Sequence, residues 1–151
     1  MKTTWLLNIA VLFVGQANCQ TNQIVFVCEH GSAKSIIAAT YFNKLAKEQN
    51  IPWLAISRGT DPDAEISPKT RALLMRENLL NNSLVPQKIN QTDVDASQQV
   101  VLFFPLPADI GTKNNTRNWL EVQAMNDDYK KLRDDILLKL VPLIDSLANH
   151  K

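Results

Sequence analysis

The amino-acid sequence predicts an α/β fold in which helices cover both faces of a parallel β-sheet. Three short and largely apolar runs, at residues 24–27, 53–57 and 100–104, are typical of β-strands. Amphipathic helical patterns lie between these runs, and such alternation favours parallel strands joined by helices. Because a sheet of this kind binds ligands at the carboxyl ends of its strands, we expect the functional residues to follow the strands.

The composition is that of one globular domain. The chain has 151 residues, of which 45% are hydrophobic and 21% charged, and its formal net charge is +1. This near-neutral balance gives no reason to expect nucleic acid as a partner. Because no cluster of metal-ligating residues is visible in the sequence, we expect neither a metal nor a cofactor.

Residues 1–19 are predicted to be a signal peptide. A basic N-terminus precedes an apolar run at residues 5–14, which is too short to span a bilayer, and small and polar residues follow. Cleavage after Cys19 would release a domain of residues 20–151, and cleavage after Ala17 is the other possibility; we expect the domain to be exported to the periplasm or secreted. The alternatives are an uncleaved N-terminal anchor and a lipoprotein cysteine at Cys19, and we expect no other membrane contact.

Cys28 stands at the end of the first strand, before a short loop with Gly31 and a helix that starts at Ser35. A strand, a tight loop and a helix N-terminus form an anion site, because the loop amides can point at one ligand and the helix dipole favours negative charge. The same field would stabilise a thiolate on Cys28 and make it a nucleophile. If Cys19 is cleaved away, no structural disulfide can form, and the alternative role for Cys28 is an inert buried side chain.

The first half of the chain contains two helices and a second strand. Apolar residues recur at helical spacing over residues 35–50, and the strand at residues 53–57 ends near Gly59, which suits a backbone position with positive φ. The second helix begins with Ser67 as its N-cap, followed by a proline at the first helical position. Its amphipathic pattern extends over residues 70–80.

The second half of the chain alternates short elements with one long helix. Residues 84–89 are predicted to be an edge element because they contain a proline, and residues 93–96 a single helical turn. After the third strand, residues 109–118 are polar and irregular. The last helix covers residues 127–149, and Pro142 within it predicts a kink or a break.

The loop resembles the signature of the low-molecular-weight protein tyrosine phosphatases and of the arsenate reductases that share their fold. In that family a cysteine is followed by five residues, an arginine, and a serine or threonine. Cys28 and Ser35 match, and Lys34 stands at the arginine position. Residues 57–60 also look like the run that lies beside the phosphate loop in the family. The resemblance implies a three-layer, flavodoxin-like fold with about four parallel strands.

The resemblance also implies a role for each residue of the loop. Cys28 would attack phosphorus, Ser35 would stabilise its thiolate as a leaving group, and Lys34 would supply the cation. Lysine offers a point charge where arginine offers a planar fork, so Arg58, next to the loop, is a candidate second cation. The residues expected to bind phosphate are Glu29, His30, Gly31, Ser32, Ala33, Lys34 and Arg58.

The general acid of the family is missing at its expected place. Family members carry an aspartate–proline pair on a late loop, where the aspartate protonates the leaving oxygen. In this chain Gln123 and Ala124 occupy that region, and glutamine cannot act as an acid. Glu121 is the first candidate to replace the aspartate. The other candidates are Asp109, Asp127 and Asp128.

These features predict a weak phosphatase-like phosphomonoester hydrolase that acts through a cysteinyl-phosphate. Its substrate would be a phosphorylated protein or a small phosphoester. The first alternative is a catalytically impaired module that binds phosphate or another inorganic oxyanion. The second is an arsenate reductase with an external thiol, because no cysteine follows Cys28 to resolve the first one.

Overall fold

The computed structural model describes residues 22–123 and 128–149, so the predicted signal peptide and Asp127 lie outside the described residues. The strands are β1 (Asn22–Cys28), β2 (Trp53–Gly59), β3 (Gln99–Leu102) and β4 (Thr116–Asn118). The helices are α1 (Lys34–Glu48), α2 (Pro68–Arg76), α3 (Gln91–Ala96) and α4 (Tyr129–Asn149). Within the described ranges, no helix is both long and apolar enough to cross a membrane.

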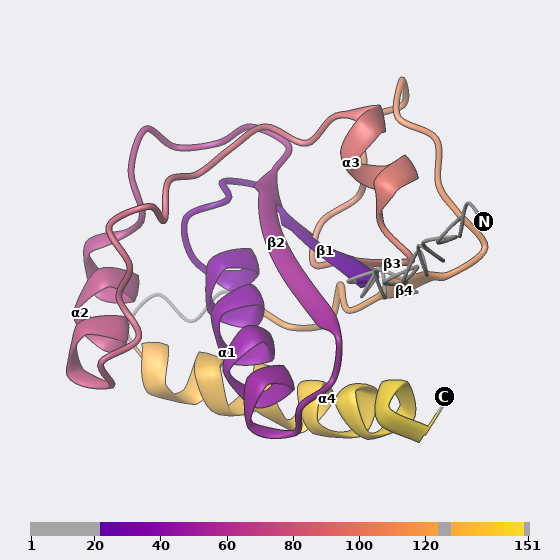
Figure 1. Ribbon diagram of the computed structural model, residues 1–151. Coiled ribbons are helices and arrows are strands. Elements are labelled where there is room, and N and C mark those ends of the chain that lie inside the picture. The colour runs from indigo at the N-terminus through magenta and orange to yellow at the C-terminus, as the bar shows by residue number, and fades with distance from the viewer. Residues whose placement is uncertain (1–21, 124–127, 150–151) are drawn as a thin grey trace, which may run out of the picture.

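The four strands form one parallel sheet in the order β2-β1-β3-β4. Helices α1 and α4 pack on one face of this sheet and α3 on the other (Figure 1). Side chains of β1 alternate between the two layers: Ile24 and Phe26 face α1 and α4, whereas Val25 and Val27 face α3. All four are fully buried, which explains the unbroken apolar run and confirms the predicted three-layer α/β fold.

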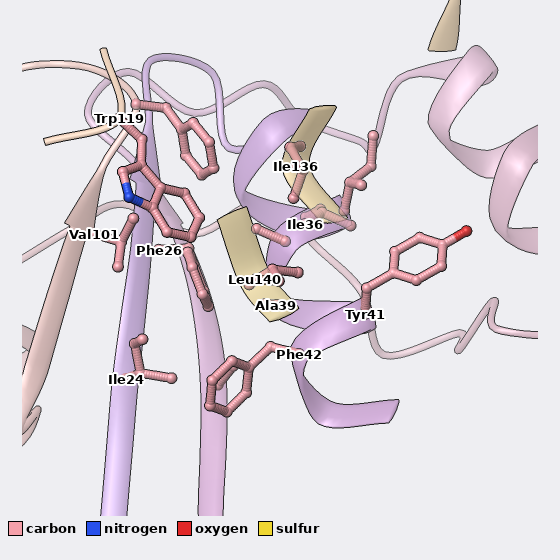
Figure 2. Close-up of a cluster of buried hydrophobic side chains, with 14 of the residues drawn as sticks. Ile24, Phe26, Ile36, Ala39, Tyr41, Phe42, Val101, Trp119, Ile136 and Leu140 are labelled. Carbon is pink, nitrogen blue, oxygen red and sulfur yellow. The ribbon is translucent and has the colours of Figure 1, made fainter. Parts of the chain in front are cut away.

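An aromatic cluster fills the larger core layer beneath the end of β1 (Figure 2). The Phe26 ring lies 5.9 Å from that of Phe42 on α1 and 6.0 Å from that of Trp119. Trp119 in turn meets Phe103 edge-on at 5.7 Å. Since Phe26 precedes Cys28 by two residues, this packing fixes the strand end from which the loop departs.

Two sequence-based expectations about the sheet are wrong. The edge strand is not residues 84–89, which contribute only an isolated bridge between Lys88 and Gly59. The two edge strands are β2 and β4, and β4 lies within the segment predicted to be irregular. Arg117 and Asn118 are exposed, and a short polar edge strand carries no apolar run that would reveal it.

Two helix boundaries also differ from expectation. Ser67 caps α2 as predicted, but the helix ends at Arg76, because Asn78 adopts a left-handed backbone conformation (φ 54°) that turns the chain. Of the kink or break predicted at Pro142, the break does not occur, since α4 runs through this residue. Buried side chains on both sides of Pro142 pack into the core and hold the helix together. They are Ile136, Leu140, Leu143 and Ile144.

Glu77 joins three helices through its carboxylate at the end of α2. Tyr41 of α1 donates a hydrogen bond to Oε2 at 2.5 Å, and Arg133 of α4 donates to Oε1. Burial acts to raise the pKa of Glu77, but the hydrogen bonds from Tyr41 and Arg133 outweigh it and lower the pKa. Burial and the Glu77 hydrogen bond raise the pKa of Tyr41, so the phenol remains a donor.

Glu77→Gln should reduce the free energy of unfolding by about 1–3 kcal/mol at neutral pH. Since the pKa of Glu77 is lowered in the folded state, its stabilisation is present above the unfolded-state pKa and is lost as the pH falls through the folded-state pKa. Urea titrations should therefore show the difference shrinking below about pH 4. Glu48→Gln, which breaks an exposed pair with Lys44, is the control; a Glu77 effect that is independent of pH would contradict the prediction.

Candidate active site

Cys28 is the last residue of β1, at the carboxyl edge of the sheet. The loop that follows joins directly to α1, which begins at Lys34. Beside Cys28 lies Gly59, the last residue of β2, paired with it in parallel register. The site therefore lies where two adjacent strands end, which is the place that the sequence predicts.

Two groups contact the thiol of Cys28. The hydroxyl Oγ of Ser35 lies 3.0 Å from Sγ, and the backbone amide of Gly31 donates a hydrogen bond to Sγ at 3.2 Å. Cys28 is 4% exposed and Ser35 is fully buried. Both contacts stabilise a negative charge on sulfur, because a hydroxyl and an amide can each donate to a thiolate.

The carbonyl groups of the loop are held by the segment that follows β2. Amides of residues 60–67 donate to them, in the pairs Thr60–Cys28 (3.0 Å), Asp61–Glu29 (2.8 Å), Asp63–His30 (3.0 Å) and Ser67–Ser32 (3.0 Å). By contrast, the amides of Glu29, His30 and residues 32–36 find no acceptor in the described part of the chain. Such amides at a helix N-terminus are the groups with which proteins bind oxyanions.

Gly31 and Gly59 let the loop lie directly against the end of β2. Gly31 has φ 61°, in the left-handed region that glycine adopts without strain. A Cβ on Gly59 would lie 2.8 Å from the Gly31 amide nitrogen and 2.9 Å from the Glu29 carbonyl oxygen. Glycine at position 59 is therefore required by the close approach of two backbones, since its φ is not in the left-handed region.

Gly59→Ala should displace the loop and lower the free energy of unfolding by about 1–3 kcal/mol, because the new Cβ meets rigid backbone. Phosphate affinity measured by calorimetry should fall with it. Gly111→Ala is the matched control, since its Cβ would meet only the Gln91 side chain, at 3.6 Å. Unchanged phosphate affinity in Gly59→Ala would show that the loop does not depend on this contact.

The Lys34 ammonium reaches from α1 to the segment that follows β4. Its Nζ donates to the Val122 carbonyl at 3.1 Å and lies 6.0 Å from the centroid of the Phe103 ring. An ammonium has three N–H donors, so this contact uses only part of its capacity. Lys34 thus ties the loop to the region where the resemblance places the general acid.

Arg58 lies outside the loop, contrary to its predicted role as a second cation. Its guanidinium donates to both carboxylate oxygens of Asp93, at 2.9 and 2.8 Å, and to the Ser57 carbonyl. Asp93 also completes the capping box of α3. Arg58 pairs in register with Val27, whose side chain faces α3, so the alternation of the strand directs Arg58 to that layer.

Glu121 is poorly suited to be the general acid. Its carboxylate accepts a hydrogen bond from Lys139, which also lies over the Trp119 ring. This hydrogen bond lowers the pKa of Glu121, which favours the ionised form, whereas a general acid must hold a proton. Asp128 accepts from the Lys131 amide and so caps the first turn of α4.

Asp63 belongs to the rim of the loop, although its sequence context suggests only a turn. The Ser32 hydroxyl donates to Asp63 Oδ2 at 2.5 Å, and Nδ1 of His30 lies 3.8 Å from Oδ1. Nδ1 also lies 3.4 Å from the Asp61 carbonyl oxygen. Because Ser32 and Asp63 are 31 residues apart, no local pattern could reveal this contact.

Comparisons with known proteins agree with this architecture. Residues 23–135 match the model of a family described as low molecular weight phosphotyrosine protein phosphatase, whereas a search of curated proteins finds no match. A thioredoxin-dependent arsenate reductase of Corynebacterium glutamicum is similar over 91% of this chain and 67% of its own, with 18% identity and a TM-score of 0.73.

Two further solved structures have the same fold. YfkJ from Bacillus subtilis is similar over 87% of this chain and 98% of its own, with 17% identity and a TM-score of 0.74. The arginine phosphatase YwlE, also from Bacillus subtilis, is similar over 85% of this chain and 97% of its own, with 16% identity and a TM-score of 0.75. At these identities the likeness concerns the fold.

Proposed function

The chain belongs to the low molecular weight phosphotyrosine protein phosphatase family, and we propose that it is a phosphomonoester hydrolase with Cys28 as the nucleophile. The observation that carries this proposal is the environment of the sulfur. Sγ accepts a hydrogen bond from the Gly31 amide and lies 3.0 Å from the Ser35 hydroxyl oxygen. It lies at the base of a loop whose remaining amides have no acceptor among the described residues.

The reaction has two steps. In the first, the Cys28 thiolate attacks phosphorus, an S–P bond forms, and the P–O bond to the leaving group breaks. The amides of Glu29, His30 and residues 32–34, together with the Lys34 ammonium, hold the phosphoryl oxygens. In the second, water attacks phosphorus and the S–P bond breaks. Ser35 then donates to the departing thiolate, which makes Cys28 a better leaving group.

The rate of hydrolysis is limited by protonation of the leaving group. With Glu121 bound to Lys139, the first candidate for a general acid is ionised. General acid catalysis typically contributes about a hundred- to ten-thousand-fold in rate. We therefore expect hydrolysis of esters with activated leaving groups, such as aryl phosphates with an electron-withdrawing substituent, and slow turnover of alkyl esters.

A single-turnover assay tests the proposal. The protein is mixed with an activated aryl phosphate, quenched in acid, and digested to locate the phosphate. A phosphopeptide that carries the label on Cys28 is expected. A labelled residue other than Cys28, or product release without any intermediate on sulfur, would contradict the mechanism.

A binding module without turnover is the second candidate, and the contact of Lys34 supports it. The ammonium donates to the Val122 carbonyl, and lysine lacks the fork with which arginine clamps two oxygens. In this case Cys28→Ser and the unaltered protein bind phosphate equally, and neither forms product. The other alternative, arsenate reduction with an external thiol, would yield arsenite only when a thiol is supplied.

We propose further that the protein is exported. The proposal is supported by the basic N-terminus, the short apolar run and the small and polar residues before position 20. N-terminal sequencing of the protein from the periplasm or the medium would then begin at residue 18 or 20. Recovery with an intact N-terminus in the membrane fraction would instead indicate an uncleaved anchor.

A further inference from the structure

A groove lies between α2 and the first turn of α4, beside the loop. It has a volume of about 860 Å³, and Pro68, Met75 and Tyr129 supply much of its apolar lining. Figure 1 shows α2 next to the N-terminal end of α4, and the two helices are in contact. Met75 is 61% exposed, so an apolar side chain of this groove remains open to a partner.

Cations outnumber carboxylates on the lining of the groove. The cations are Lys69, Arg71, Arg76 and Lys130, and the carboxylates are Glu65 and Asp128. Both carboxylates have local partners. Glu65 Oε2 lies 3.9 Å from Arg71 Nη2, and Asp128 accepts a hydrogen bond from the Lys131 amide in the first turn of α4. Arg76 and Lys130 are exposed and form no ion pair within the described residues. The excess positive charge of the groove therefore lies on the wall formed by α2, and Lys130 adds an exposed cation on the wall formed by α4.

Ser67 connects the groove to the phosphate loop. Its amide donates to the Ser32 carbonyl in the loop at 3.0 Å, and its hydroxyl donates to the Tyr129 hydroxyl in the groove at 3.3 Å. Ser67 is thus in hydrogen-bond contact with the loop on one side and with a lining residue of the groove on the other. A bound peptide advances about 3.3 Å per residue when extended, so the flanking residues of a peptide anchored in the loop can reach the groove.

We infer that this groove binds an acidic segment of a phosphorylated protein substrate, next to the residue that carries the phosphate. The inference rests on the proposed function and specifies its substrate class. Arg76 and Lys130 contact carboxylates of the segment, and the surface formed by Met75 and Tyr129 receives an apolar side chain. Preference for acidic flanks distinguishes this role from recognition of the phosphoryl group alone.

Matched phosphotyrosyl peptides test the inference. One carries glutamates on both sides of the phosphotyrosine, and the other carries glutamines at the same positions. The unaltered protein should hydrolyse the acidic peptide with a kcat/KM about three- to tenfold higher, and the preference should decline at about 0.5 M salt. Arg76→Gln/Lys130→Gln should remove the preference while hydrolysis of a small aryl phosphate is unchanged.

A control double variant, Lys47→Gln/Arg117→Gln, removes the same charge from exposed positions on α1 and β4. It should retain the preference for the acidic peptide, and Arg76→Lys should retain most of it. Equal kcat/KM for the two peptides, or a preference that survives Arg76→Gln/Lys130→Gln, would overturn the inference and leave the proposed function intact.

If the protein is not a phosphatase, the same peptides give a different result. No substrate is then hydrolysed and no cysteinyl-phosphate forms, and calorimetry of the same peptides with Cys28→Ser decides the role of the groove. Tighter binding of the acidic phosphopeptide, dependent on Arg76 and Lys130, would support the groove on its own. Equal affinities would overturn it.

Discussion

Cys28→Ser should lower the rate of aryl phosphate hydrolysis by more than about a thousandfold, because a serine hydroxyl here has no base to activate it. At the base of the loop the sulfur is contacted by the Gly31 amide and by the Ser35 hydroxyl, which can both donate to a thiolate. The rate is measured at saturating substrate and again in a single turnover. In the single turnover, the phosphate that remains bound to the protein after the acid quench should be absent from Cys28→Ser.

Ser35→Ala provides the matched comparison. It leaves the nucleophile in place and removes the hydroxyl that stabilises the thiolate in the second step. The intermediate should therefore accumulate, so that a burst of one equivalent precedes slow turnover. Phosphate should still bind to Cys28→Ser, which shows that the loop remains folded. If Cys28→Ser retains the activity of the unaltered protein, Cys28 is not the nucleophile.

Lys34→Arg should raise kcat for an aryl phosphate by about ten- to a hundredfold. A guanidinium at this position can donate to two phosphoryl oxygens as charge develops in the transition state, whereas an ammonium acts as a point charge. The measurement is kcat for the two proteins, with phosphate affinity taken from competitive inhibition. Because the gain belongs to the transition state, kcat should rise more than phosphate affinity.

Two further variants, Lys34→Gln and Lys139→Arg, are the controls for Lys34→Arg. Lys34→Gln removes the positive charge and should reduce both phosphate affinity and kcat, since the contact with the Val122 carbonyl also depends on Nζ. Lys139→Arg makes the same substitution at a lysine that contacts Glu121 and Trp119 and should leave kcat within about twofold. A fall in kcat for Lys34→Arg, with the fold intact, would show that Lys34 acts through Val122 and not through the anion.

Features that depend on neighbouring residues could be predicted from the sequence. The strand that ends at Cys28, the loop with Gly31 and the cap at Ser67 all follow from short-range backbone chemistry, and the structure has each of them. The contact between Cys28 and Ser35 belongs to the same class, because both residues lie in one strand–loop–helix unit. The family resemblance rests on this unit, and the match over residues 23–135 confirms it.

Features that depend on distant residues were decided by the tertiary structure. Arg58 stands near the end of β2, beside the loop, but the strand alternation directs it to Asp93, 35 residues away. Lys34 bonds to Val122, 88 residues away, and Glu121 is bound to Lys139. Each of these charged groups selects its partner by proximity in the folded chain, which a local pattern does not encode.

The helix ends and the sheet edge show the same division. The apolar pattern beyond Arg76 reflects burial of Leu79 and Leu80 against the core and not continuation of α2. Likewise, β4 is polar because it needs only one partner strand and little burial. Thus the sequence by itself determined the position of Cys28 and the loop that surrounds it, because both are local. The tertiary structure decided which charged groups lie beside that loop, because these groups come from distant parts of the chain.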